Sequence, residues 1–349
     1  MTRVRAGGRS ADRTKSALRP EACETCPTTY RFGDGYLDFS SDDTGFDARF
    51  RDLYRECIVR EARADDSPAV GCAVRAGKDQ ARIDFDDPEP LDQCAFATSL
   101  LAPHGYHESA PARPGWRTVR SATDQGRLDF RGGRIQAFGR SPWQSVVASL
   151  ALHRVLRLQP RTLFFHAASV GVDGGGVLLF GAKGVGKTTL SLALAEAGHA
   201  FLGDEIAAVR TDTLELLPFR RRLSIRKGPA CDAVRRALKG GDVLVTAVAD
   251  GTVRFHLHAD RLRLRRPAAA VPLRAAVVLR GQAAAPRLER FRPSTRDLHY
   301  FAPLESTTWL AGRGSVALRV LSLASRVPCY LLDLGPIPQT VALLVTLPE

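Results

Sequence analysis

The chain has 349 residues, of which 44% are hydrophobic and 25% charged, and its formal net charge is +13. A chain of this length is expected to form two domains, or one large domain with an appendage. No apolar run approaches the roughly 18 residues that a membrane-spanning helix needs, and the basic N-terminus lacks the apolar core of a signal peptide. We therefore expect a globular protein of the cytoplasm with no membrane partner.

The positive charge is concentrated in the second half of the chain. Residues 1–150 contain 22 basic and 22 acidic side chains, and the remaining 28 basic and 15 acidic side chains lie in 151–349. A positive field in that half would attract nucleotides and acidic substrates, and it is also compatible with nucleic acid. A solvated surface in an arginine-rich protein explains the same excess, so charge alone leaves the partner open.

The first third of the chain is expected to contain a basic arm, a small domain and a linker. Residues 1–27 have few large apolar side chains and predict a disordered arm. Residues 28–102 predict a small mixed α+β domain for recognition or assembly, with a helix over 46–59 and a hairpin over 70–85. Residues 103–125 are rich in Pro and Gly and predict a linker.

From residue 126 onward strands and helices alternate, which is typical of an α/β domain extending to residue 349. A hairpin is expected at Gly132-Gly133, and Ser141-Pro142 is expected to cap a helix that starts at Trp143. A further short helix is expected earlier, at 94–101. Further strands are expected at 163–170, 177–180, 201–203, 206–210, 214–217, 275–280 and 330–334, and helices at 187–197 and 338–345.

Residues Gly181–Thr188 read Gly-Ala-Lys-Gly-Val-Gly-Lys-Thr, a complete G-x-x-x-x-G-K-[ST] phosphate loop. The glycines allow backbone N–H groups to point at a phosphate chain. Lys187 would reach the β- and γ-phosphates, and the Thr188 hydroxyl would bind Mg²⁺. The loop therefore predicts ATP and Mg²⁺ as ligands. The residues predicted to bind ATP are Gly181, Ala182, Lys183, Gly184, Val185, Gly186, Lys187, Thr188 and Thr189.

Three short stretches around this loop resemble one known family. His166 lies 21 residues before Lys187, Gly198-His199 follows the loop helix, and Asp204-Glu205 begins 17 residues after Lys187. This pattern resembles the catalytic half of HPr kinase/phosphorylase, a P-loop group related to phosphoenolpyruvate carboxykinase. The resemblance is good over about 140–230, general in shape from there to the end, and absent from about the first 125 residues.

The resemblance implies an α/β P-loop kinase domain of the HPr kinase/phosphoenolpyruvate carboxykinase type over 126–349. It implies that Asp204 is the general base for the acceptor hydroxyl, that His166 is a catalytic-site histidine, and that Lys187 is catalytic. The family usually has two Asp at 204–205. The longer Glu205 side chain suits a position near Mg²⁺, so we expect Thr188 and Glu205 at the metal.

Several arginines follow the acidic pair, and guanidinium groups can neutralise a developing phosphoryl charge. Arg222 and Arg226 are the candidate contacts to phosphate or substrate. The Glu-containing motif of the family is not evident over 218–228, so HPr as substrate and the reverse phosphorylase reaction are left open. A second basic run, 261–266, has Arg at alternate positions and predicts one face of a strand, which either docks a substrate or is solvated.

The seven cysteines are odd in number and scattered, so they do not predict a disulfide framework. Cys23 and Cys26 form the one C-x-x-C pair. A structural zinc site would need a second close pair, so we expect free thiols, and metal binding by Cys23 and Cys26 is left open.

The best-supported hypothesis is an ATP-dependent kinase acting on a hydroxyl of a peptide, protein or small molecule, as in biosynthetic clusters for modified peptides. By resemblance the chain is also a candidate homo-oligomer. One alternative is a nucleotide-dependent switch or a nucleic-acid-associated ATPase, although no N-K-x-D guanine motif is present. Another is a degenerate kinase fold that only binds a partner, which the intact Lys187, Thr188 and Asp204 argue against. A chain starting near Leu128 is expected to retain ATP binding.

Overall fold

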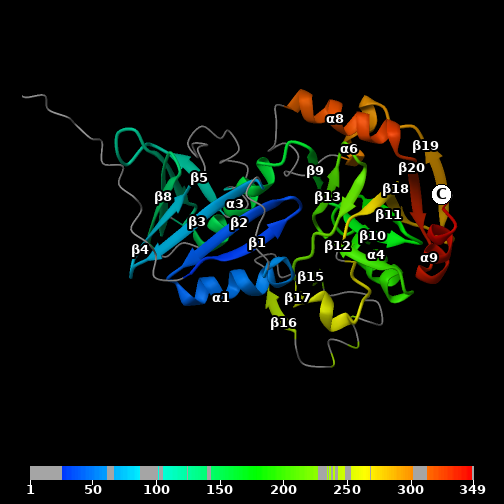
Figure 1. Ribbon diagram of the computed structural model, residues 1–349, viewed down its shortest axis with the longest axis horizontal. Helices are drawn as coiled ribbons and strands as arrows, with labels where there is room; N and C mark the ends of the chain where they lie inside the picture. The colour runs from blue at the N-terminus through cyan, green and yellow to red at the C-terminus, as the bar shows by residue number, and fades with distance from the viewer. Residues whose placement is uncertain are drawn as a thin grey trace, which may run out of the picture.

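The computed structural model describes residues 26–60, 67–86, 101, 105–123, 125–139, 143–226, 234, 236, 239, 243–247, 253–267, 269–301 and 313–347. Figure 1 shows two lobes, with the N-terminal lobe in blue and cyan on one side and the C-terminal lobe, in green to red, on the other. The basic arm predicted over 1–27 lies almost wholly outside the described residues, and so does the helix predicted at 94–101. The Ser141-Pro142 cap also lies outside them.

The first lobe is built on an eight-stranded sheet with the order β1-β2-β3-β4-β8-β7-β6-β5. The pairing of β2 with β3 is parallel, and the other pairs are antiparallel. The strands are β1 Thr28–Phe32, β2 Gly35–Ser41, β3 Ala69–Ala76, β4 Gln80–Phe85, β5 Tyr106–Ser109, β6 Arg117–Ser121, β7 Gly126–Arg131 and β8 Arg134–Gly139.

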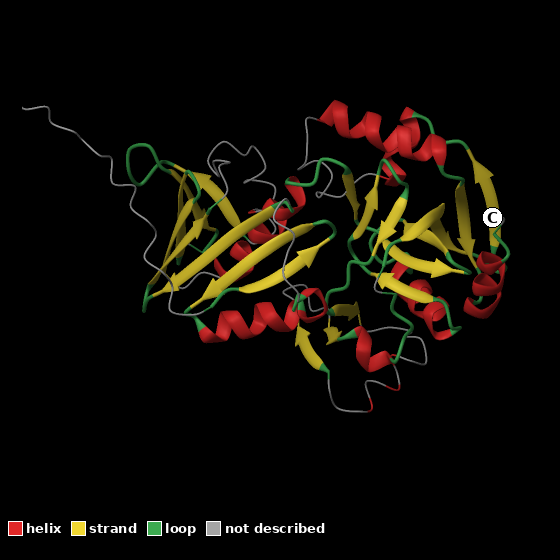
Figure 2. Ribbon diagram, viewed as in Figure 1, coloured by secondary structure: helices red, strands yellow, loops and turns green. Residues whose placement is uncertain are grey.

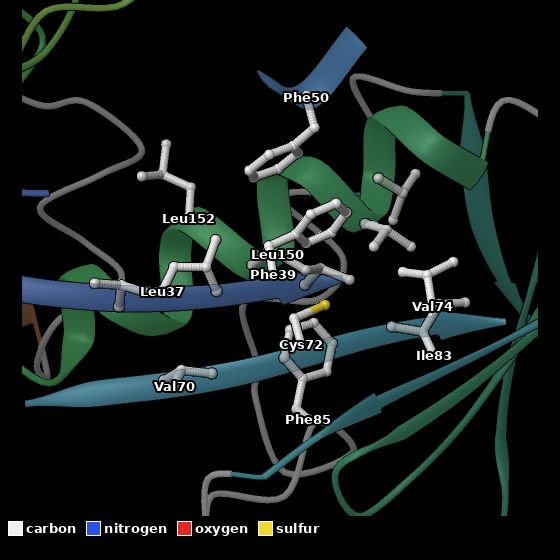
Figure 3. Close-up of a cluster of buried hydrophobic side chains, with 14 of the residues drawn as sticks. Leu37, Phe39, Phe50, Val70, Cys72, Val74, Ile83, Phe85, Leu150 and Leu152 are labelled. Atoms are coloured by element: carbon white, nitrogen blue, oxygen red, sulfur yellow. The ribbon is translucent and has the colours of Figure 1, made fainter. Parts of the chain in front are cut away.

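Two helices cover one face of this sheet. Helix α1 (Thr44–Leu53) begins where the Asp43 side chain accepts a hydrogen bond from the N–H of Phe46, an N-cap arrangement. Helix α3 (Trp143–Arg157) packs beside it, and the Phe46 and Trp143 rings meet edge to face at 5.4 Å. Figure 3 shows Phe39, Phe50, Ile83 and Leu150 among the side chains that fill the space between α1, α3 and the strands. Alternate apolar positions of the strands therefore form the core.

The predicted boundary between a small N-terminal domain and a linker differs from the structure. Within 103–125, residues 106–109 and 117–121 are strands β5 and β6 of the first sheet. Strand β7 pairs with β6, and β8 pairs with β4, so a cut at residue 126 divides one sheet. The prolines lie outside these two short strands, which explains why composition alone suggested a linker. A recognition or assembly role for this lobe stays a prediction.

The second lobe is a mixed α/β structure on a nine-stranded sheet, as its strand–helix alternation predicted. The strand order is β12-β10-β11-β18-β14-β13-β9, with β20 paired to β18 and β19 paired to β20. The strands are β9 Thr162–Phe165, β10 Ala168–Val172, β11 Gly175–Phe180, β12 Ala200–Gly203, β13 Ala207–Arg210, β14 Glu215–Leu217, β18 Val271–Gln282, β19 Arg287–Phe291 and β20 Cys329–Leu334.

Helices cover both faces of this second sheet (Figure 2). Helices α4 (Lys187–Glu196) and α9 (Ile337–Val345) pack on one face, in a cluster that contains Leu190, Leu194 and Leu344. Helices α6 (Leu298–Phe301) and α8 (Arg313–Arg326) pack on the other face. Among the described residues, no helix is long and apolar enough to cross a membrane.

A third, three-stranded sheet lies below the junction of the two lobes in Figure 1. Its order is β15-β17-β16, from β15 Leu223–Arg226, β17 Val253–Leu257 and β16 Leu244–Ala247. The strand predicted over the basic run 261–266 is wrong. That run continues from a 3-10 helix, Ala259–Leu262, into a loop, and Arg263 has a left-handed backbone.

The two lobes share one hydrophobic core. Phe219 of the second lobe stacks on Phe32 of β1, with ring centroids 5.6 Å apart, and its ring also meets Phe164 of β9 edge to face at 6.4 Å. Ala208 and Leu217 belong to the same buried cluster as the side chains of the first lobe. This cluster crosses between the lobes, so the first lobe buries its apolar surface partly against the second, which also has core clusters of its own.

The sequence alone predicts that a chain starting near Leu128 retains ATP binding, but from the shared sheet and core we predict instead that this chain fails to fold cooperatively. The deletion leaves β7 and β8 without β4 and β6, and it exposes the face of α3 that packs on β2 and β3. Thermal unfolding followed by circular dichroism should give no sigmoidal transition for this chain, in contrast to the full-length protein. A cooperative transition together with MgATP binding would show that the second lobe is independent.

Candidate functional site

The phosphate-loop sequence lies between a central strand and a helix. Strand β11 pairs with β10 on one side and runs parallel to β18 on the other, and its side chains 177–180 are buried. Gly186 caps α4 with a φ of 122°, which only glycine adopts without strain. The first N–H groups of α4 have no partner inside the helix, so they point from its N-terminus toward the loop. This strand, loop and helix match the order that the sequence predicted.

Lys187 begins α4 and is only 7% exposed. Its ammonium donates to the carbonyl oxygens of Gly181, at 2.7 Å, and Ala182, at 3.2 Å. Burial lowers the pKa of Lys187, and Arg226 lowers it further, whereas the Asp204 carboxylate opposes both effects. Within the described residues this cation is therefore hydrogen-bonded to the loop itself and not to a carboxylate.

Asp204 follows the last residue of β12 and is 4% exposed. The hydroxyl of Thr188 donates to its Oδ2 at 2.9 Å, which joins the loop helix to the acidic pair. A Cβ on Gly203 would lie 2.3 Å from the carbonyl oxygen of Phe219, so glycine is required where the chain turns into Asp204. Burial raises the pKa of Asp204, opposed by the Thr188 hydrogen bond and by the charges of Arg221 and Lys187.

Glu205 points to a different partner from Asp204. Its backbone is left-handed, with a φ of 68°, and its carboxylate pairs with the Arg221 guanidinium. The two acidic side chains at the end of β12 therefore diverge, and Asp204 is the one hydrogen-bonded to Thr188. The metal position expected for Glu205 stays a prediction that no contact in the described residues supports.

His166 lies in the gap between β9 and β10, which together replace the single strand predicted over 163–170. Its Nδ1 is 3.1 Å from the carbonyl oxygen of Glu205, and since a carbonyl only accepts, Nδ1 carries the hydrogen. Burial lowers the pKa of His166 to about 4, with further lowering from Lys187, Arg221 and Lys183. His166 is therefore neutral near pH 7, with Nε2 as an acceptor.

The predicted arginine contacts differ in their positions. Arg226 lies beside the loop, because a Cβ on Gly184 would be 3.4 Å from its Nη1. Arg222 instead pairs with Asp52 of α1, and its backbone N–H donates to Leu53. The structure thus brings Arg226 to the phosphate loop and holds Arg222 at the lobe junction.

Two arginines at the site were not assigned a role from the sequence. Arg221 pairs with Glu205 at the acidic turn, and Arg254 of β17 is the cross-strand partner of Arg226. Arg221 is one of the arginines that follow the acidic pair in the sequence, but only the three-dimensional path of 219–222 shows which arginine faces which element. Arg254 had no signal, because its pairing with Arg226 joins residues 28 positions apart in sequence.

The metal-ligating side chains of the site are few. No group of three or more His, Cys, Asp or Glu side chains that could hold a metal ion occurs in the described part of the chain. Cys26 is exposed and free, and Cys23 lies outside the described residues. Thr188 and Asp204 supply hydroxyl and carboxylate oxygens, which are the donors that Mg²⁺ prefers.

Comparisons with known proteins give a likeness to solved structures but not to a protein family. No family profile matches the chain, and no curated protein matches it either. A solved structure described as the Hpr(Ser) kinase/phosphatase from Coxiella burnetii is similar over 53% of this chain and 92% of that chain, with 12% identity and a TM-score of 0.25. These values are too low to carry an argument, so function rests on the geometry of the site.

We predict that His166 makes folding sensitive to acid. Its pKa is about 4 in the folded protein and about 6.5 when unfolded, so the unfolded chain binds more protons between these values. Stability contributed by neutral His166 is complete above about pH 6.5 and is lost as pH falls toward 4. The measurement is urea unfolding at pH 7.5 and at pH 5. Between these pH values the free energy of unfolding should fall less in H166Q than in wild type, by about 1 kcal/mol after solvent screening.

The control for this experiment is H107Q, which changes an exposed histidine of β5. It should keep the pH dependence of the wild-type protein. Equal pH dependence in wild type and H166Q would contradict the buried, neutral state of His166.

Proposed function

We propose that this protein is an ATP-dependent phosphotransferase, with a P-loop kinase lobe of the HPr kinase type, that acts on a hydroxyl group of its acceptor. The observation that carries this proposal is the 2.9 Å hydrogen bond from the loop residue Thr188 to the buried Asp204, beside the buried Lys187. A buried carboxylate in this position can accept the proton that must leave the acceptor hydroxyl during phosphoryl transfer.

The residues around the loop fit ATP with Mg²⁺. Lys187 is a buried cation whose hydrogen bonds go to two carbonyl oxygens, and Arg226 adds a second positive charge beside Gly184. The N-terminus of α4 adds N–H groups that favour an anion. The Thr188 hydroxyl would bind Mg²⁺, which would supply charge neutralisation at the phosphates and leave Asp204 to act as the base.

Asp204 is suited to accept the proton of the acceptor. Its Oδ2 accepts from Thr188, and no hydrogen bond to Oδ1 is formed within the described residues. In the proposed transfer the acceptor oxygen bonds to the γ-phosphorus, the bond from that phosphorus to ADP breaks, and the hydroxyl proton moves to Oδ1. A pKa raised by burial makes Asp204 a stronger base than an exposed aspartate.

His166 and Arg221 position this base from opposite sides. His166 donates to the carbonyl of Glu205, and Arg221 pairs with the Glu205 side chain. Both contacts fix the turn that follows Asp204. Because neutral His166 is already a donor at Nδ1, its Nε2 would accept and not donate a hydrogen bond, so it would not serve as a cation at the γ-phosphate.

The prediction for this function uses K187M and D204N. K187M removes the cation of the loop and should weaken MgATP binding at least about tenfold by calorimetry. D204N keeps the shape of the side chain but not its basicity, and it should slow phosphoryl transfer roughly 10²- to 10³-fold. Transfer is followed by mass spectrometry of a lysate treated with enzyme and labelled ATP, as products heavier by one phosphoryl group.

Two surface variants serve as controls: K78M in the exposed β3–β4 turn and D212N in the exposed turn after β13. Both should behave as wild type. Wild-type transfer by D204N would remove the base assignment. ATP hydrolysis that duplex DNA stimulates, with no phosphorylated product, would favour the nucleic-acid-associated ATPase instead.

A further inference from the structure

The arginines near the site fall into two groups that differ in their partners. In the first group each guanidinium forms an ion pair with a carboxylate. These pairs are Arg220 with Glu56, Arg221 with Glu205 and Arg222 with Asp52. Arg226 and Arg254 form the second group, and neither makes an ion pair within the described residues. The hydrogen bond of Arg254 goes to a neutral group, the Ser224 hydroxyl, at 3.2 Å.

Arg226 and Arg254 lie directly opposite each other in the β15–β17 ladder. Side chains at directly opposed positions share one face of the sheet, with Cβ atoms about 5 Å apart. Like charges in this arrangement destabilise a sheet. The Nε of Arg254 is also buried and forms no hydrogen bond within the described residues. Two adjacent cations that have no carboxylate partner in the described part of the chain form an arrangement that an added anion would stabilise.

One face of the ladder leads from the lobe junction to this pair. Arg222 and His258 flank the ladder at the junction, and Asp52 bonds to both of them. The ladder continues through Ser224 opposite His256 and ends at Arg226 opposite Arg254. Arg226 is the member next to Gly184 of the phosphate loop. Arg254 is one strand further from the loop, so a group held by Arg254 would lie beside the phosphates and not among them.

The pKa of His256 indicates that this face is positively charged. Burial lowers the pKa of His256, and the charges of Arg222, Arg254 and Arg221 lower it further, against an opposing effect of Asp52. The histidine is therefore neutral near pH 7, and it adds a polar group but no charge. The positive potential on this face comes from the arginines, and the carboxylate of Asp52 is already bonded to Arg222 and His258.

We propose that Arg254, together with Arg226, forms an anion site for the acceptor, so that the hydroxyl substrate carries a carboxylate or phosphate near its hydroxyl group. This inference rests on the proposed phosphotransferase function and specifies its substrate class. Arg226 contacts the nucleotide phosphates on one side and the acceptor anion on the other. Arg254 contacts the acceptor anion, and guanidinium groups suit such anions because they donate in a bidentate geometry.

The anion has two sources that share this chemistry, an acidic residue of a peptide or a small hydroxy acid. The test therefore uses full-length protein saturated with MgADP, which occupies the phosphate loop, and two kinds of probe. A fluorescent Ser peptide flanked by Glu is compared with the same peptide flanked by Gln by anisotropy. Glycerate is titrated as a competitor of the Glu peptide and, separately, by calorimetry.

We expect the Glu peptide, glycerate or both to bind. If the peptide binds, the affinity for the Glu peptide should exceed that for the Gln peptide at least about tenfold, which is the effect of one charge-assisted contact. R254Q should abolish this binding and leave the MgADP affinity within about twofold. R226Q should weaken both. R254K keeps the charge and should retain part of the anion binding. The control is R131Q, an exposed arginine of β7 in the first lobe, which removes the same charge and should change neither.

Any of three results would overturn the anion site. The first is that neither probe binds the MgADP-loaded protein, and the second is that R254Q binds the probes as wild type does. The third is that R254Q weakens MgADP binding as strongly as R226Q does. Circular dichroism melting of each variant identifies any loss of folding, and R254K then takes the place of R254Q. MgADP binding without anion binding overturns this inference alone, whereas absence of MgADP binding in wild type overturns the phosphotransferase proposal itself.

Discussion

The junction of the two lobes depends on one short segment, residues 219–222, which contacts β1, α1, β12 and the acidic turn. Phe219 enters the shared core against Phe32, and its N–H donates to the carbonyl of Leu202 in β12. The three arginines that follow each reach a carboxylate in a different place. The apolar contact buries the ring, and the ion pairs then fix the path of the chain on either side of it. Without this segment the lobes, the acidic turn and the β15–β17 ladder would have no common anchor.

This segment makes the chemistry of the second lobe depend on the first. Arg221 holds Glu205 at the acidic turn, while Arg222 is held by Asp52 at the end of α1. The position of Asp204 is therefore set from both lobes, although Asp204 contacts only the second. The opposite pKa shifts of Lys187 and Asp204 follow from the same burial, since a low-dielectric site disfavours either ion and each partly stabilises the other. A site of this kind is electrostatically strong, because little water screens it.

Local patterns in the sequence predicted local structure well. The loop flanked by an apolar strand and a helix, the hairpin at Gly132-Gly133 and the helix from Trp143 depend on neighbouring residues, and all three are confirmed. The prediction of a linker failed because the structure of that region depends on pairing between segments that are distant in sequence. Strands β5 and β6 have partners but little apolar length of their own, so composition suggested a linker. Among the arginines, the sequence named Arg222 and missed Arg254, because ion pairs and cross-strand neighbours follow from tertiary packing.

Ion pairs with carboxylates distinguish the arginines that position the chain from those that we propose contact a ligand. An arginine that serves the fold gains most when a carboxylate faces it, since an unpaired buried charge costs free energy. The arginines at 220–222 satisfy this condition. Within the described residues Arg226, which is exposed, and Arg254, which is half-buried, make no ion pair, and Arg226 lies beside the phosphate loop. Such local repulsion is expected at a binding site for an anion. When the anion binds, it removes the repulsion between the two arginines, and this gain adds to its binding free energy. The unfavourable placement of Arg226 opposite Arg254 is therefore best explained by a ligand that binds between them.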